Sequence, residues 1–185
     1  MAGLELYHTA YGEIRRPDVH FGRKKADLGQ GFYTTPDADF AVRWARERKD
    51  ARVCVNVYEL ELAGLTVLRL ERDEAWLDYL FGSRTGRPDP HPEADVVIGP
   101  IANDTLYDTF GIFTSGLLAR EDALRLLQLG PAYEQVVLKT ERAAGQLHWR
   151  AGREPDAAEL ARVRVQMKAE EEAYQRAVAE AMEAL

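Results

Sequence analysis

Cysteine, a leading signal segment and long apolar runs are scarce or absent in this sequence. Its one cysteine, Cys54, excludes a disulfide framework and a paired-cysteine metal or redox site. Cys54 lies within the apolar run RVCVNVYEL, so we expect it to be a small core side chain. The first residues lack a basic start and an apolar stretch, and no apolar run approaches membrane-spanning length. We therefore expect a cytoplasmic protein that is not embedded in a membrane.

Positive charge is also in deficit. The chain has 24 Lys and Arg against 31 Asp and Glu, which gives a formal net charge of -7. This deficit disfavours a protein that holds nucleic acid by neutralising phosphates over its whole surface, although a local basic patch is compatible with it. The 4 histidines are scattered, without a second histidine at ligand spacing, so we expect no metal site.

What is present is the composition of a globular domain. Of the 185 residues, 46% are hydrophobic and 30% are charged, and the sequence has no internal repeat. Apolar and β-branched runs predict strands at LELYH, FYTT, ARVCVNVYELEL, TVLRLE, ADVVIGP and YEQVVLKT. We expect the third and fourth of these strands to pair as neighbours across the turn AGL. Helical segments are interspersed with the strands, so the sequence predicts an α+β fold.

One predicted helix directly follows FYTT. In PDADFAVRWARERK, Thr35 is expected to cap the helix and Pro36 to occupy its first position. The spacing predicts a core-facing stripe formed by Phe40, Ala41, Trp44 and Ala45. Further helices are predicted at RDEAWLDYLFGSR, NDTLYDTF and REDALRLLQLG, and Thr140 is expected to cap a short turn before QLHW.

The last part of the chain has a different pattern. We predict one domain at residues 1–153 and an amphipathic helical tail at residues 154–185. The tail has a near-heptad apolar stripe made of Leu160, Val163, Met167, Tyr174, Ala177, Ala181 and Leu185. Two interpretations are open: the helix packs on its own domain, or it binds a partner or a second copy of the chain.

The segment between the first two predicted strands is the most basic in the chain. GEIRRPDVHFGRKKADLGQG contains a proline and several glycines, which predict a loop. Its cations are Arg15, Arg16, Arg23, Lys24 and Lys25. These cations can form a solvated surface, with Asp27 pairing with the lysines, or they can contact phosphate groups of a ligand or target.

Three segments place a polar or aromatic side chain at a strand terminus: YHT, GQGFYTT and YEQVVLKT. A histidine, a tyrosine and an acidic or amide residue on three strands resemble the ADP-ribosyltransferase fold, in its diphtheria-toxin-like His-Tyr-Glu/Gln class. The similarity is strongest to a bacterial group labelled domain of unknown function 3990, through LYH, DLGQGFYTT, GPIANDTLY and EQVVLKT in that order. It covers most of Leu4 to Trp149. The resemblance implies a split β-sheet core with flanking helices, followed here by a long C-terminal helix.

The resemblance implies that NAD is the substrate, and it assigns three catalytic roles. Tyr33 stacks on the nicotinamide ring, which contributes about 1 kcal/mol beyond area burial. His8 donates a hydrogen bond to a ribose hydroxyl. Gln135 binds the 2′-hydroxyl of the nicotinamide ribose as the glycosidic bond breaks through an oxocarbenium-like species. Glu134 is the alternative to Gln135, because neighbours on a strand point to opposite faces and only one can enter the pocket.

The same resemblance implies a set of NAD-binding residues around this triad: Thr9, Gly29, Gly31, Phe32, Arg23 and Lys24. The backbone of Thr9 holds the nicotinamide carboxamide. The two glycines let the backbone approach the ligand where a Cβ would clash. The two basic residues contact the NAD pyrophosphate. In NDTLYDTF, Asn103 and Asp104 either cap a helix or line the acceptor side of the pocket with Tyr107.

The leading hypothesis is a mono-ADP-ribosyltransferase that transfers ADP-ribose from NAD to a protein, nucleic acid or small-molecule acceptor. Small bacterial enzymes of this type act as toxins or defence effectors, so the resemblance implies a neutralising antitoxin as partner. The alternatives are an NAD glycohydrolase, with water as acceptor, and a catalytically inactive NAD-binding module. RNA 2′-phosphotransfer on the same fold is disfavoured by the acidity of the chain.

Overall fold

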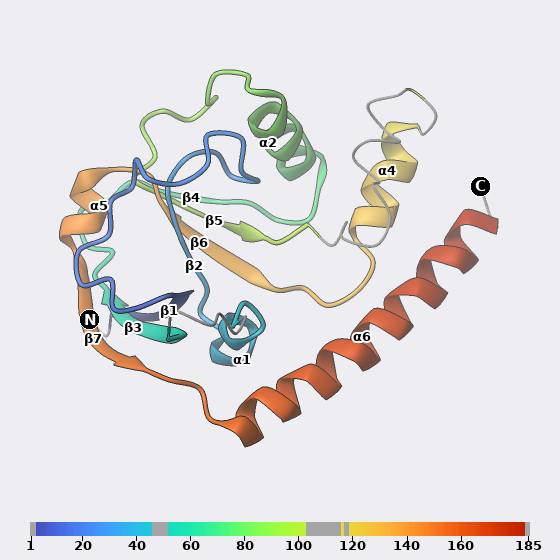
Figure 1. The fold of residues 1–185 in the computed structure, drawn as a ribbon. Coiled ribbons are helices and arrows are strands. Elements are labelled where there is room, and N and C mark those ends of the chain that lie inside the picture. The colour runs from blue at the N-terminus through green and yellow to red at the C-terminus, as the bar shows by residue number, and fades with distance from the viewer. Residues whose placement is uncertain (1–2, 46–51, 103–115, 117–118, 184–185) are drawn as a thin grey trace.

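The computed structural model describes residues 3–45, 52–102, 116 and 119–183. These residues form two β-sheets, flanking helices and a long C-terminal helix (Figure 1). The predicted α+β class is confirmed. Among the described helices, none is both long enough and apolar enough to cross a membrane.

The first sheet contains three antiparallel strands in the order β1 (Leu4–Ala10), β3 (Cys54–Leu60) and β7 (Leu147–Arg153). Cys54 is buried, as predicted. The short helix α5 (Glu141–Gly145) precedes β7, and the hydroxyl of Thr140 caps it by accepting a hydrogen bond from the amide of Ala143. The predicted cap is therefore confirmed, and the LHW of QLHW belongs to a strand.

The second sheet contains four strands in the order β2 (Phe32–Thr34), β6 (Glu134–Leu138), β5 (Val96–Pro100) and β4 (Val67–Arg69). β6 is antiparallel to β2 and β5, whereas β4 and β5 are parallel. The prediction that β3 and β4 pair is wrong, because they lie in different sheets. The Asp95 carboxylate accepts a hydrogen bond of 2.8 Å from the amide of Thr66, which aligns β4 with β5 instead.

The main core lies between the two sheets. Its buried side chains come from both of them and include Leu6, Tyr58 and Leu60 from the first sheet and Phe32, Ile98, Val136 and Leu138 from the second. A second core lies between the opposite face of the second sheet and α2 (Glu74–Thr85), and it includes Trp76, Leu77, Leu80, Val97 and Val137. The second sheet is buried on both faces, which explains the continuous apolar run of β6.

Helix α1 (Ala38–Val42) begins later than predicted. Its cap is Asp37, whose carboxylate accepts a hydrogen bond of 2.9 Å from the amide of Phe40. Thr35, the predicted cap, instead forms a β-bridge with β1. Trp44 is 59% exposed, so its predicted core position is wrong: the helix ends two residues earlier. Residues 46–49 of the predicted helix lie outside the described part of the chain.

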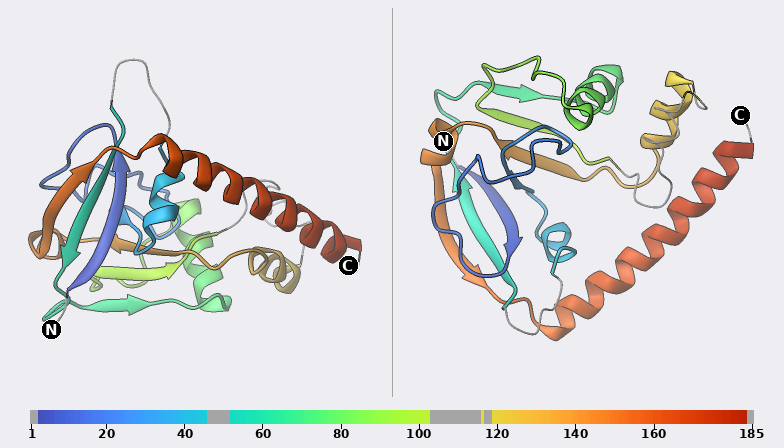
Figure 2. Two further views of the ribbon diagram at one scale, coloured as in Figure 1. Left: turned by 90° about the horizontal axis from the view of Figure 1, so that it is seen from below. Right: turned by 45° about the horizontal axis from the view of Figure 1, so that its top comes forward.

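The C-terminal helix α6 (Ala157–Glu183) packs on its own chain at two places. Val163 lies in a cluster with Ala41, Val42 and Val55, near the start of the helix. Further along, Tyr174 and Val178 pack on Leu126 of α4 (Arg120–Leu127), which confirms the predicted helix at REDALRLLQLG. Figure 2 shows α6 extending from the first sheet to α4. At Val163 and Tyr174, the apolar stripe of the tail therefore packs on its own domain.

A partly buried ion pair anchors the middle of α6 to the rest of the domain. The guanidinium of Arg43 and the carboxylate of Glu170 lie 2.6 Å apart, with side chains 13% and 24% exposed. The hydroxyl of Tyr133 donates to the same carboxylate at 2.7 Å. Burial raises the pKa of Glu170, but the hydrogen bonds from Tyr133 and Arg43 outweigh it and hold the pKa below its usual value. Glu170 is thus ionised at neutral pH and joins α6 to the start of β6.

Both glycines of GQGFYTT are required by the fold itself. Gly29 has a φ of 77°, in the region that favours glycine. A Cβ on Gly31 would lie 2.6 Å from the carbonyl oxygen of Leu138 and 2.6 Å from a methyl carbon of Val137. β2 can therefore begin beside β6 only if residue 31 lacks a side chain.

The contact at Gly31 predicts a loss of stability in Gly31→Ala. The added methyl group meets backbone that cannot shift without disturbing the β2–β6 pairing, so we expect a loss of about 1–3 kcal/mol in urea unfolding. The control is Gly145→Ala, where a Cβ would meet nothing within 4 Å and where the helix favours alanine. Equal unfolding midpoints for the two variants would contradict the tight packing at residue 31.

The ion pair of α6 predicts a large effect for Glu170→Ala. This change leaves the Arg43 guanidinium partly buried without its carboxylate, so we expect a loss of about 3 kcal/mol in thermal or urea unfolding. Lys168→Ala is the matched control, because its pair with Glu172 is exposed, at 79% and 55%, and we expect a change within about 0.5 kcal/mol. Loss of the same size in both variants would show that α6 does not depend on this pair.

Candidate functional site

The two sheets meet where β1 and β2 touch. The amide of Tyr7 donates to the carbonyl of Thr35 at 2.8 Å, and the amide of Thr35 donates to the carbonyl of Tyr7 at 3.0 Å. Past this bridge the two strands separate, since β1 pairs with β3 and β2 pairs with β6. We call the place where they separate, at His8, Thr9 and Tyr33, the sheet junction.

The imidazole of His8 is fixed at the sheet junction. Its Nδ1 lies 2.7 Å from the carbonyl oxygen of Tyr33, and its ring packs on Phe32 with centroids 4.5 Å apart. A carbonyl only accepts, so Nδ1 carries the proton and Nε2 has the lone pair. Burial lowers the pKa of His8, and the bond to Tyr33 offsets only part of that effect. His8 is therefore neutral at pH 7, with Nε2 as an acceptor.

The backbone of Thr9 faces the gap between the strands. In an antiparallel pair, alternate residues direct their amide and carbonyl groups to opposite sides of the strand. Tyr7 directs both groups to β2, so Thr9 directs its own groups the same way, beyond the bridge. There the carbonyl of Tyr33 is taken by His8. Within the described part of the chain, β2 supplies no partner to this amide and carbonyl of Thr9.

The side chain of Thr9 ties the sheet junction to α1. Its hydroxyl donates to the carbonyl of Ala41 at 2.5 Å, so the end of β1 and the helix that follows β2 are held together. This bond leaves the main-chain groups of Thr9 as its contribution to any ligand.

The hydroxyl of Tyr33 is engaged by the turn before β2. It accepts from the amide of Leu28 at 3.0 Å and donates to the carbonyl of Gly29 at 2.6 Å. Burial raises the pKa of Tyr33 well above its usual value. Lys139 donates to the carbonyl of Leu28 and so supports the same turn. Tyr33 is therefore held rigidly, and its ring packs against the second core, on the face of β2 opposite Phe32.

The third catalytic candidates lie on opposite faces of β6. Tyr33 is paired with Val137, so Gln135, two residues away, lies on the same face as Tyr33. Gln135 is 6% exposed, and its amide donates to the carbonyl of Pro100 at 3.1 Å. Glu134 is exposed and lies on the face of Phe32, against which His8 packs. The structure thus groups Tyr33 with Gln135, and His8 with Glu134.

Glu134 is also held close to the bridge between the sheets. The hydroxyl of Thr35 donates to the carbonyl of Glu134 at 2.9 Å, and the backbone of Thr35 is bonded to Tyr7, next to His8. These contacts bring Glu134, at the start of β6, close to the end of β1, although the two strands are far apart in the sequence.

The basic loop does not form the expected pair with Asp27. The carboxylate of Asp27 binds Arg84 of α2 instead, at 2.9 Å. Arg23 and Lys24 are exposed. The structure therefore assigns these two side chains to the loop surface, and their expected contact with NAD is untested.

Sequence reasoning missed Arg43 and Tyr133 as supports of this region. The guanidinium of Arg43 lies over the ring of Tyr133, 4.4 Å from its centroid. The ring of Tyr133 in turn packs on the ring of Phe40, with centroids 4.5 Å apart. Tyr133 directly precedes Glu134, so the cluster fixes the start of β6. No short motif contains this signal, because the residues come from three distant segments.

No group of three His, Cys, Asp or Glu side chains in the described ranges is placed to hold a metal ion. Asn103, Asp104 and Tyr107, the other candidates for the acceptor side, lie outside the described residues.

The comparisons with known proteins give a family but no activity. No curated protein and no solved structure matches the chain. A family defined as "protein of unknown function (DUF3990)" matches residues 4–149, which include the sheet junction and β6 and end before α6. Since this match covers most of the 185 residues, the chain belongs to the DUF3990 family.

Proposed function

We propose that this protein binds NAD at the sheet junction and transfers ADP-ribose from it to an acceptor. The observation that carries the proposal is the amide and carbonyl of Thr9, which face the gap between β1 and β2 beside the neutral imidazole of His8. A carboxamide has one acceptor oxygen and an NH₂ donor, so it complements this backbone pair. The ring of Tyr33 lies on the opposite face of β2 from Phe32 and packs on the second core, so it supports the strand from behind and does not form the aromatic surface expected from the sequence.

His8 contributes an acceptor and not the donor expected from the sequence. With Nδ1 committed to the carbonyl of Tyr33, the neutral ring presents the lone pair of Nε2. A ribose hydroxyl donates to that nitrogen, which orients the sugar without placing a cation beside it. A neutral group suits a reaction in which positive charge develops on the ribose.

Glu134 is the better third residue on structural grounds, although the pattern of the sequence favours Gln135. The amide of Gln135 is buried and bonded to Pro100, whereas Glu134 is exposed on the side of the sheet where His8 packs. A carboxylate also stabilises an oxocarbenium-like species better than an amide does. We therefore assign the 2′-hydroxyl of the nicotinamide ribose to Glu134, with Gln135 supporting the strand.

The test is nicotinamide release from NAD by the purified protein, measured by chromatography with and without a cell extract as a source of acceptors. We expect Glu134→Gln to lower kcat by about 100-fold or more with little change in KM, because the carboxylate acts mainly in the transition state. Glu71→Gln, at an exposed carboxylate away from the sheet junction, is the control.

Release that requires the extract supports transfer, and release without it supports the glycohydrolase alternative. Two results would contradict the proposal: no NAD binding at millimolar concentration, or full activity in Glu134→Gln. Binding without any release would support the inactive binding module.

The tautomer of His8 predicts how NAD binding depends on pH. Protonation removes the acceptor at Nε2, and burial lowers the pKa of His8 below the ordinary histidine value of 6.5. We therefore expect NAD affinity to be constant from about pH 8 to 6.5 and to fall only at lower pH. The folded protein favours the neutral form of His8, so His8 does not reduce folding stability at a pH above its pKa in the unfolded chain. Folding stability is lost as the pH falls from that value through the lower pKa of the folded state.

Isothermal calorimetry of NAD binding at several pH values checks this dependence. His148→Ala, at an exposed histidine of β7, should leave the profile unchanged, whereas His8→Ala should weaken binding at every pH. Affinity that rises as the pH falls below 6.5 would show that the charged imidazole is the binding form.

A further inference from the structure

The loop between β1 and β2 carries cations that have no carboxylate partner. Residues 15–25 contain five basic side chains and one carboxylate, although the chain as a whole has a formal net charge of -7. Within the described part of the chain, no hydrogen bond or ion pair involves the side chains of Arg16, Arg23, Lys24 or Lys25. All four are exposed.

Arginines elsewhere in the fold are commonly neutralised. Ion pairs join Arg84 to Asp27, Arg150 to Glu59, Arg153 to Glu159 and Arg162 to Asp39. In the loop, Glu13 pairs with Arg15 at 2.7 Å, whereas Asp27, two residues after Lys25, binds α2 and leaves the other four cations without a carboxylate from the described ranges. The positive charge of the loop is therefore concentrated and available to an anionic partner.

An aromatic side chain projects from the same loop. Phe21 is 91% exposed, whereas most large apolar side chains of the chain are covered. Its turn is well held: the backbone amide of Phe21 donates to the carbonyl of Asp18 at 3.3 Å, and the side-chain amide of Gln30 donates to the carbonyls of His20 and Gly22 at 2.6 and 3.0 Å. An exposed aromatic ring on a held turn, three residues before Lys24, is suited to stack on an unpaired base.

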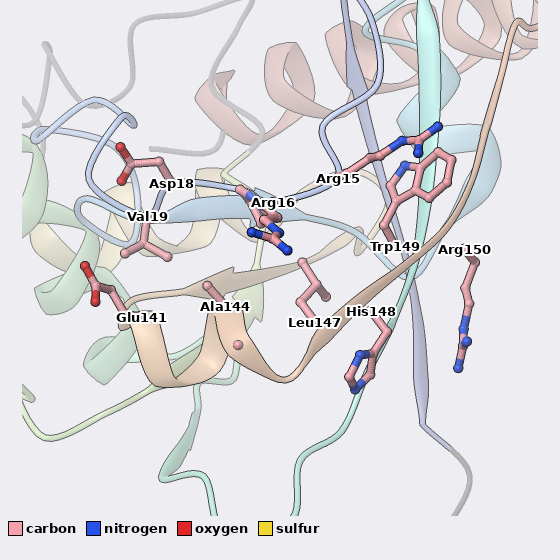
Figure 3. Close-up of a pocket in the computed structure, with 12 residues that line it drawn as sticks. Arg15, Arg16, Asp18, Val19, Glu141, Ala144, Leu147, His148, Trp149 and Arg150 are labelled. Atoms are coloured by element: carbon pink, nitrogen blue, oxygen red, sulfur yellow. The ribbon is translucent and has the colours of Figure 1, made fainter.

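A groove of about 770 Å³ begins next to this turn. Figure 3 shows Arg16 directed over it, between the loop and α5. The guanidinium of Arg15 lies 4.5 Å from the ring centroid of Trp149, whose indole N–H donates to Asn56 at 3.1 Å. Two carboxylates, Asp18 and Glu141, also line the groove on the side of the loop. Arg15 also pairs with Glu13 at 2.7 Å and Arg150 with Glu59, so Arg16 is the arginine of the groove lining that keeps an unpaired charge among the described residues.

The basic loop extends from this groove to the end of α2. Its residues 15–19 line the groove, and the side chain of Lys25 lies beside Gly86, the residue that caps α2. Phe21 and the remaining cations lie between these two ends of one short segment. A flexible polyanion several units long can follow such a strip, whereas a single small anion would use only one end.

We propose that the basic loop and the groove at Trp149 form a binding surface for single-stranded nucleic acid. The cations contact phosphates, and Phe21 stacks on a base. A duplex is a poorer partner because its bases are already stacked and cannot reach the ring of Phe21. An acidic protein segment would use the charges but not the aromatic ring. This inference does not depend on NAD chemistry; if both hold, nucleic acid is a candidate acceptor.

The test is fluorescence anisotropy with a labelled single strand of about 20 nucleotides, without NAD, at several salt concentrations from about 50 mM. We expect Arg23→Ala/Lys24→Ala/Lys25→Ala to weaken binding at least tenfold and to reduce the slope of log K against log salt by about 2 units. Phe21→Ala should weaken single-strand binding about 5-fold or more and leave the binding of the matched duplex unchanged.

The control is Arg69→Ala/Arg125→Ala/Arg176→Ala, which removes three exposed cations on other elements; it should have little effect. The proposal is overturned if the single strand does not bind at low salt, or if the control variant weakens binding as much as the loop variant. It is also overturned if poly-glutamate binds as well as the strand and Phe21→Ala changes neither. Nicotinamide release is measured separately, so the two proposals can fail independently.

Discussion

The bridge between Tyr7 and Thr35 is the constraint on which the rest of this structure depends. At this bridge β1 and β2 hydrogen-bond to each other. Beyond it, from His8 onward along β1, the two strands separate into different sheets. The carbonyl that β1 would otherwise bind, that of Tyr33, is taken by the imidazole of His8. The separation therefore fixes the tautomer of His8 and leaves the backbone of Thr9 facing outward.

Several parts of the fold could be predicted from the sequence because their causes are local. The alternation in LELYH, the β-branched run of β3 and the hydroxyl of Thr140 before α5 each act within a few residues. The pairing of β4 could not be predicted, since it depends on a carboxylate at Asp95, far along the chain. Trp44 was misplaced for a related reason: the apolar spacing continues past the point where α1 ends.

The candidate site shows the same limit. The sequence singled out His8 and Tyr33, and the structure joins the imidazole of His8 to the main-chain carbonyl of Tyr33, while the ring of Tyr33 packs on the other face of β2. It favoured Gln135 over Glu134 without knowing which face of β6 each residue occupies, because that face depends on register, and the register here is set by the pairing of Tyr33 with Val137. Nor could it reveal that Glu170, outside the matched family region, supports the start of β6 through Arg43 and Tyr133. The tail thus contributes to the same region as the family domain.

The two proposed surfaces are neighbours in the chain: the sheet junction lies at the end of β1 and on β2, and the basic loop is the connection between these two strands. The loop is anchored at its start, where the amide of Ile14 donates to Asn56 and the hydroxyl of Tyr58 donates to the carbonyl of Ile14. At its end it is anchored by the hydroxyl of Tyr33. Between these anchors its cations stay exposed. Loops held by a rigid scaffold commonly carry function.

The most direct test of the central claim is a long-range ¹H–¹⁵N correlation spectrum of the histidine rings, recorded with increasing NAD. The account predicts that His8 is neutral with its proton on Nδ1, and that its Nε2 signal moves on binding while those of the exposed His148 and His91 do not. A proton on Nε2 of His8, or NAD binding that leaves the His8 signals unchanged, would contradict the assignment of the sheet junction as the NAD site.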